Sequence, residues 1–312
     1  MCKWRKIIRN LLPLIFLMKA AGLPAQEEKL FRAQQLLGAK QAEQAALVID
    51  SVIAHPDTKG DFISWTTRAY IYFDLYKRSD RSKLNSPLRD TIISSVRVSQ
   101  SLSPDSTYRE NNKKLLTNLA ANYFNLGKMY LQDSLNSDNS LIAYNRYKEV
   151  YLMAEPGANL SQKDVDYYLA AGSIYADIFN KDNNKVQAGE TAKVSLLKVL
   201  ELQPDHPNAL MNMGLMYYNQ AVNITQSIGY GTDLSQIEVI QENIVKLAKQ
   251  SEQFVVRVYN NDHKNAKAVE ALYYIYRMLN EFEKSDDFKN KCKELGIDVT
   301  QTSGDNQNNS PK

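Results

Sequence analysis

Apolar residues recur along this chain at helical spacing, in long stretches that are separated by short polar segments. One set of stretches ends at four prolines spaced 48, 52 and 48 residues apart, and a further stretch ends at the Asn-Asn-Asp sequence of residues 260–262. Because proline cannot continue a helix and disfavours helix in the residue before it, each proline marks a helix end. The prolines are Pro56, Pro104, Pro156 and Pro204, and the helices predicted before them are Gln41–Ala54, Leu88–Leu102, Leu141–Ala154 and Gln187–Leu202.

Between these ends lies a second set of amphipathic stretches, rich in aromatic residues three and four positions apart. Apolar residues at i, i+3, i+4 and i+7 are typical of a helix with a wide buried face, and no segment alternates at period two as a half-buried strand would. The predicted helices of this set are Ser64–Tyr76, Lys113–Tyr130, Val165–Phe179, Ala209–Ile224 and Ala266–Phe282. The pattern predicts an all-α array of about five or six helix pairs, stacked as a solenoid.

One of these units resembles the tetratricopeptide repeat, whose first helix carries a large residue, Leu-Gly and Tyr, and whose second carries Ala, a large residue and Pro. The matching residues are Leu210, Met213-Gly214 and Tyr217 in the first helix and Ala192, Leu196, Val199 and Pro204 in the second helix before it. Partial matches are Trp65, Arg68-Ala69 and Tyr72; Tyr123, Leu126-Gly127 and Tyr130; Tyr168, Ala171-Gly172 and Tyr175; and Val269, Leu272-Tyr273 and Tyr276. The resemblance implies a solenoid of antiparallel helix pairs, although the family's repeat is only about 34 residues long.

Three glycines, Gly127, Gly172 and Gly214, occupy the same position of the motif. Each costs about 1 kcal/mol relative to alanine in an isolated helix. Their repetition therefore indicates that two helices cross closely at this position, where only a small side chain fits. A generic helical bundle with glycines placed by chance is the alternative.

The first 25 residues have the three parts of a secretory signal peptide: a basic start, the apolar run of residues 11–18, and small residues before Gln26. The apolar run is too short to span a bilayer as a stable helix. Cleavage near Ala25 is predicted, which places the protein in the periplasm or outside the cell; an uncleaved anchor is the alternative, because Lys19 interrupts the run. The predicted organisation is a signal peptide over residues 1–25, a repeat domain over 26–296 and a disordered polar tail over 297–312.

The net charge of +3 belongs to the signal peptide, because residues 26–312 carry 33 basic and 35 acidic side chains. With no basic cluster on that segment, nucleic-acid binding has no electrostatic basis.

His55, His206 and His263 stand at helix ends and are predicted to be turn residues, since zinc needs converging ligands. Cys292 is predicted to be a half-buried helix residue. No nucleophile motif or phosphate-binding loop occurs, so no catalytic residue, metal or cofactor is predicted.

The family resemblance implies a binding face, because the first helices of such pairs line a concave groove that binds extended peptides or partner helices. The groove residues carried over onto this sequence are Tyr70, Phe73, Asp74, Phe124, Asn125, Lys128, Gln132, Leu169, Asp177, Asn212, Leu215, Tyr218, Asn219 and Tyr274. Aromatics mixed with amides suit protein recognition, and burial between adjacent repeats is the alternative for the aromatics.

Polar linkers are predicted within four helix pairs, over Lys77–Ser86, Gln132–Ser140, Asn180–Lys185 and Thr225–Gln236. Three of them are interpreted as solvated turns. The fourth carries Ile228 and Tyr230 among glycines, an apolar pair that is predicted to contact a partner.

The predicted function is that of an exported, non-catalytic scaffold or adaptor that binds a protein or peptide through the groove, with no membrane span after signal cleavage. One alternative is a glycan-binding component of an outer-membrane uptake system, and another is a structural subunit of an envelope assembly. A third is an enzyme on a helical scaffold, which would need two facing carboxylates with shifted pKa values in a cleft.

Overall fold

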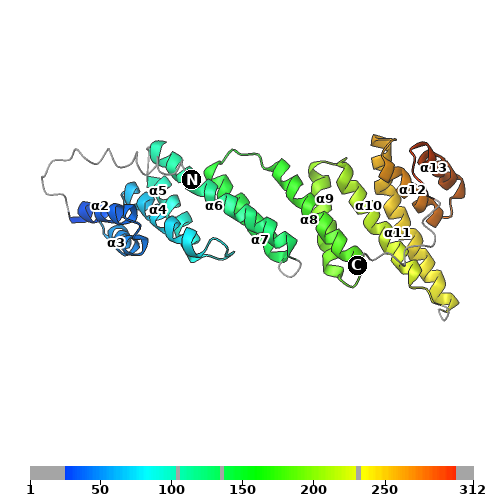
Figure 1. The fold of residues 1–312 in the computed structure, drawn as a ribbon, viewed down its shortest axis with the longest axis horizontal. Coiled ribbons are helices and arrows are strands. Elements are labelled where there is room, and N and C mark those ends of the chain that lie inside the picture. Colours follow the sequence, from blue (N-terminus) through cyan, green and yellow to red (C-terminus); the bar gives the residue numbers. More distant parts are fainter. Residues whose placement is uncertain (1–24, 103–105, 134–136, 230–232, 300–312) are drawn as a thin grey trace, which may run out of the picture. The chain divides into compact units, whose positions relative to one another are not determined.

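The computed structural model describes residues 25–102, 106–133, 137–229 and 233–299, and every regular element in these ranges is an α-helix (Figure 1). The helices of the first half are α2 (Ala25–Gly38), α3 (Ala42–Ala54), α4 (Phe62–Ser79), α5 (Pro87–Leu102), α6 (Ser106–Gln132) and α7 (Ser137–Ala154). Those of the second half are α8 (Ser161–Lys181), α9 (Val186–Leu202), α10 (Pro207–Gln226), α11 (Leu234–Asn261), α12 (Ala266–Met278) and α13 (Phe282–Glu294). The predicted all-α fold is confirmed. Residues 1–24 of the predicted signal peptide and 300–312 of the predicted tail lie outside the described residues.

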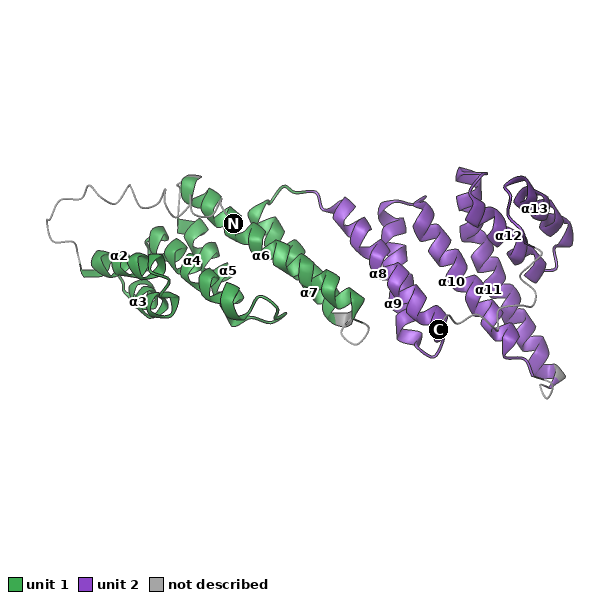
Figure 2. Ribbon diagram, in the orientation of Figure 1, with its two compact units in different colours: residues 1–158 green, residues 159–312 purple. Residues whose placement is uncertain are grey.

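Consecutive helices pack as antiparallel pairs, which are α2/α3, α4/α5, α6/α7, α8/α9, α10/α11 and α12/α13. The chain divides into two compact units, residues 1–158 and 159–312, and each contains three of the pairs (Figure 2). Within the first unit α4 lies against α6, and within the second α10 lies against α8 and α12. First helices thus pack on first helices within each unit, as in the predicted solenoid of helix pairs.

Most helices extend further than predicted, so the linkers within the pairs are shorter. Helix α4 begins at Phe62, because the carboxylate of Asp61 accepts hydrogen bonds from the backbone N–H groups of Ile63 (3.1 Å) and Ser64 (2.9 Å). It continues to Ser79, so only residues 80–86 of the predicted Lys77–Ser86 linker form a loop. The basic residues at its end favour the helix, since cations stabilise a helix C-terminus.

One helix ends four residues earlier than predicted. The apolar stretch Ala266–Phe282 was expected to form a single helix, but α12 ends at Met278 and Phe282 begins α13. Asn280 turns the chain between the two with a φ of 59°, a left-handed conformation that asparagine adopts more readily than most residues. Gly296, with a φ of 73°, follows α13 in the left-handed conformation that a glycine after a helix commonly adopts.

The glycines of the motif lie where paired helices cross, as predicted, but they are not equally crowded. A Cβ at Gly214 would overlap Cγ2 of Val255 on α11, and a Cβ at Gly172 would lie 2.6 Å from Cγ of Leu196 on α9. At Gly127 the nearest atom of the neighbouring helix would lie at 3.5 Å, which is an ordinary contact. Close approach therefore requires glycine at the first two positions and not at Gly127.

In three of the helix pairs, a buried serine of the second helix bonds to a carbonyl of the first helix. Ser140 donates to the carbonyl of Gly127 (2.8 Å), Ser251 to that of Gly214 (2.7 Å) and Ser285 to that of Tyr273 (3.2 Å). Each hydroxyl satisfies its own donor in the apolar interior by bonding to a helix carbonyl. The same polar contact thus recurs in pairs α6/α7, α10/α11 and α12/α13.

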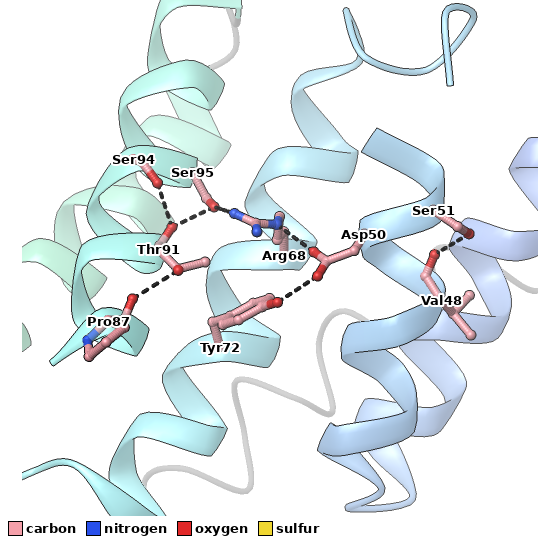
Figure 3. Close-up of polar contacts among 9 residues, drawn as sticks. All are labelled: Val48, Asp50, Ser51, Arg68, Tyr72, Pro87, Thr91, Ser94 and Ser95. Atoms are coloured by element: carbon pink, nitrogen blue, oxygen red, sulfur yellow. Dashed lines mark hydrogen bonds and ion pairs between the residues drawn. The ribbon is translucent and has the colours of Figure 1, made fainter. Parts of the chain in front are cut away.

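A polar network joins the first two pairs (Figure 3). Arg68 on α4 donates to the carboxylate of Asp50 on α3 (2.7 Å) and to the hydroxyl of Ser95 on α5 (2.8 Å). Tyr72 donates to the other oxygen of Asp50 (2.6 Å), and its ring lies 4.7 Å from the Arg68 guanidinium. These contacts hold α4 to both neighbouring helices through one partly buried arginine.

Candidate functional site

Some predicted groove residues of the first unit are exposed, and others are buried or half-buried between helices. Asn125, Lys128 and Gln132 lie on one exposed face of α6, at spacings of three and four residues. Phe73 on α4 is only 6% exposed and stacks on Tyr76 with ring centroids 6.2 Å apart. Tyr70 is half-buried with its hydroxyl 3.4 Å from the carbonyl oxygen of Asn111, and burial raises its pKa to about 12.

Two more predicted groove residues of this unit are engaged by neighbours. The carboxylate of Asp74 is half-buried and forms ion pairs with Arg78 and with the ammonium group of Lys77 (3.4 Å). Phe124 is half-buried against Tyr147 of α7, with ring centroids 5.1 Å apart. The Lys128 ammonium lies 5.3 Å from the Phe124 ring, so Phe124 is covered on two sides.

In the second unit the predicted groove residues line the packing of α8, α10 and α12. Asn212 on α10 donates to the hydroxyl of Ser173 on α8 (2.7 Å). Burial, and then the proximity of Tyr274, raises the pKa of Tyr218. The residues that pack at the rim of this unit's core are Leu215, Tyr218 and Tyr274, whereas Leu169 and Asn219 are half-buried and Asp177 is exposed. Ile228 is half-buried after α10, and Tyr230 lies outside the described residues.

A pocket of about 350 Å³ opens between the end of α4, the loop after it and α6. Its lining includes Lys77, Arg78, Arg81, Asn122, Asn125 and Met129, and we call it the basic pocket. Of these residues only Asn125 was predicted to face a partner. The sequence signal for the three basic residues is the run KRSDRSK of residues 77–83, which was interpreted as a solvated turn.

The three cations of the basic pocket differ in how they are paired. Arg78 pairs with Asp74 and lies 3.7 Å from a carboxylate oxygen of Glu43, and Lys77 pairs with Asp74. Arg81 is exposed, and among the described residues no side chain bonds to its guanidinium. Arg81 is therefore the cation of the pocket whose charge is available to a ligand.

A fully buried arginine lies behind the pocket. The guanidinium of Arg89 on α5 donates to the carbonyl oxygens of Leu84 (2.9 Å) and Lys83 (2.8 Å) and to the hydroxyl of Tyr76 (3.1 Å). It also stacks on the ring of Tyr123, at 4.1 Å from the ring centroid. Its partners are neutral, and no carboxylate of the described residues pairs with it. Arg89 thus holds the loop of residues 80–86 against α4 and α6.

Asn122 connects this buried arginine to the pocket. Its side-chain oxygen accepts from Arg89 (3.1 Å) and from the hydroxyl of Tyr76 (2.5 Å), and its NH₂ group donates to the carbonyl of Arg81 (3.1 Å). Because arginine can only donate, the amide orientation is fixed by chemistry: oxygen inward and NH₂ toward the pocket. The loop is held further by Asp80, whose pKa is lowered by hydrogen bonds from Lys83 and then Ser86.

The residues weighed for chemistry occupy structural positions. His206 caps α10 by accepting from the N–H of Ala209 (3.3 Å), and Nδ1 of His263 lies 2.7 Å from the carbonyl oxygen of Tyr259, so both are turn residues as predicted. Cys292 is fully buried, and burial raises the pKa of its thiol. In the part of the chain that the structure describes, no three His, Cys, Asp or Glu side chains are placed to hold a metal ion. None of the described helices is long and apolar enough to cross a bilayer.

Comparisons with known proteins do not identify a family for this chain. No family model matches the sequence, and no curated protein matches it. A solved structure described as PilW, a widely conserved type IV pilus biogenesis factor, aligns over 88% of this chain and 94% of that chain, with 15% identity and a TM-score of 0.25. A TM-score of this size supports no conclusion about fold or function. The description of this chain as tetratricopeptide-like rests on its paired helices and on the glycine crossings.

Proposed function

We propose that this chain is a non-catalytic helical-repeat scaffold that binds a protein or peptide partner through the exposed face of its first helices. The basic pocket is the main support for this proposal. It lies between first helices α4 and α6, where the family resemblance puts the groove, and it adjoins the exposed residues Asn125, Lys128 and Gln132 on α6. A preformed surface of this kind requires little backbone change on binding.

Export to the periplasm or beyond is part of the same proposal. It rests on the basic start, the apolar run and the small residues within residues 1–25. The partner would then be an envelope or secreted protein.

A structural subunit that docks through its second helices is the second candidate. Its support is the apolar side chains that α9 leaves exposed, with Val186 62% and Val194 54% accessible. Exposed apolar residues that cluster on one face are typical of docking surfaces. The two candidates differ in which helices of a pair the partner contacts.

Crosslinking in cells that produce the tagged chain, followed by mass spectrometry of captured proteins, tests the proposal. The variant Lys128→Glu/Gln132→Glu alters the exposed face of α6 outside the basic pocket. We expect it to reduce capture of the main partner about tenfold, since charge repulsion at an interface rim slows association. The matched control, Asn145→Glu/Arg146→Glu, makes the same charge change on exposed positions of α7.

Capture that is lost in the control and kept in the α6 variant would contradict the proposal and favour the second candidate. Binding to polysaccharide columns in place of any protein would favour the glycan-binding alternative. Circular dichroism of both variants shows whether each remains folded.

A further inference from the structure

We infer that the basic pocket binds a side-chain carboxylate of an acidic, extended segment of the partner protein. This inference rests on the proposed function and adds the chemistry of the ligand. It is carried by the charge of the pocket, by the buried arginine behind it and by its size and lining.

The charge of the pocket is local and is not a property of the whole surface. Residues 77–83 carry four basic side chains and one acidic one, whereas residues 159–312 carry 16 basic and 20 acidic ones. Lys77 and Arg78 are accounted for by the preference of cations for a helix C-terminus and by their pairing with Asp74. Arg81 lies beyond the helix and is not explained in this way, so its free guanidinium points to an external anion.

The buried arginine makes the pocket wall more favourable for an anion. Arg89 carries its charge where water is excluded and is balanced by neutral oxygens and aromatic rings. A charge in such surroundings is weakly screened and acts over a longer distance than an exposed one. Through Asn122, whose oxygen it holds, Arg89 turns an amide NH₂ toward the pocket. That NH₂ has two donors, of which one bonds to the carbonyl of Arg81.

The size and lining of the pocket favour a peptide side chain over a larger or more highly charged ligand. A volume of about 350 Å³ admits a side chain with its neighbours. Leu126 and Met129, the latter 48% exposed, provide an apolar wall for methylene groups. A phosphate dianion would bring two negative charges into a pocket in which two of the three cations already pair with Asp74. A single carboxylate on an aliphatic side chain fits a pocket with one unpaired cation and an apolar wall better.

Fluorescence polarisation with labelled peptides tests the inference. The probe is a 12-residue peptide of alternating Glu and Ser, amidated at its C-terminus so that only side-chain carboxylates are present, and its partner probe has Gln in place of Glu. We expect the purified chain to bind the Glu peptide about tenfold more tightly than the Gln peptide. We also expect Arg81→Glu to weaken that binding about tenfold.

The matched control is Arg97→Glu, the same charge change at an exposed position of α5 outside the pocket. Equal weakening by both variants would show general charge attraction and would overturn the pocket assignment. Equal affinity for the two peptides, or full displacement of the Glu peptide by millimolar inorganic phosphate, would overturn the peptide ligand. Loss of peptide binding with partner capture still dependent on Lys128 and Gln132 would leave the proposed function standing, so the two failures are distinguishable.

Discussion

Replacement of Arg89 by methionine is expected to lower the free energy of unfolding of the first unit by about 3 kcal/mol, because it removes a fully buried donor from several partly buried acceptors. The carbonyl oxygens of Lys83 and Leu84 would lose their charged partner, and the side-chain oxygen of Asn122 would lose one of two donors. Methionine fills much of the same volume, so the loss reports the hydrogen bonds and not a cavity. Arg89→Lys keeps the charge but lacks the planar guanidinium group. We expect its stability to lie between that of the unsubstituted chain and that of Arg89→Met.

Urea unfolding followed by tryptophan fluorescence measures this effect in the relevant unit, since Trp65 on α4 is the only tryptophan of residues 25–312. Arg97→Met is the matched control, because Arg97 is exposed and, among the described residues, its guanidinium hydrogen-bonds to the sulfur of Met153 (3.7 Å) and to no carboxylate. We expect the control to change stability by less than about 0.5 kcal/mol. Equal stability of the two variants would mean that water replaces Arg89 at no cost, and would contradict its role as the support of the loop.

Substitution of alanine for two glycines of the motif is expected to have different effects on stability. Gly214→Ala should destabilise the second unit by about 2 kcal/mol, because its Cβ would overlap Val255, a fully buried β-branched residue with little rotamer freedom. Gly127→Ala should leave the first unit unchanged or stabilise it by up to about 1 kcal/mol. Its Cβ finds ordinary contacts, and alanine favours the helix.

Urea unfolding followed by far-ultraviolet circular dichroism compares the two variants with the unsubstituted chain. Gly127→Ala serves as the control for Gly214→Ala, since both changes add one methyl group at the same position of the motif. Destabilisation of similar size in both would show that Gly127 and Gly214 are equally crowded, and would contradict the difference seen in the structure. No change at Gly214 would mean that α11 moves away from α10 at little cost.

The paired helices could be predicted because their apolar periodicity is a local property of the sequence. The helix ends were less predictable where local signals compete. Lys77 and Arg78 are polar and were assigned to a linker, yet a helix C-terminus favours them. The break at Asn280 lies inside an apolar stretch, so the pattern continued across a turn that the backbone makes at a single residue.

The basic pocket could not be predicted because it depends on contacts between distant segments. Arg89 has the sequence context of an exposed helix residue, and it is buried only because the loop of residues 80–86 folds over it. Asn122 gains its fixed orientation from residues 33 and 46 positions away. The motif likewise assigned equal weight to three glycines, whereas the structure requires glycine at two of them and leaves room at Gly127.

The most direct test of the binding face is site-specific photocrosslinking in cells that produce the chain. A photoreactive phenylalanine analogue replaces Asn125, on the exposed face of first helix α6, or Asn145, an exposed residue of second helix α7. We expect a discrete crosslinked protein from position 125 and none from position 145. A crosslinked protein from position 145 alone would contradict binding through the first helices and would place the partner on the second helices.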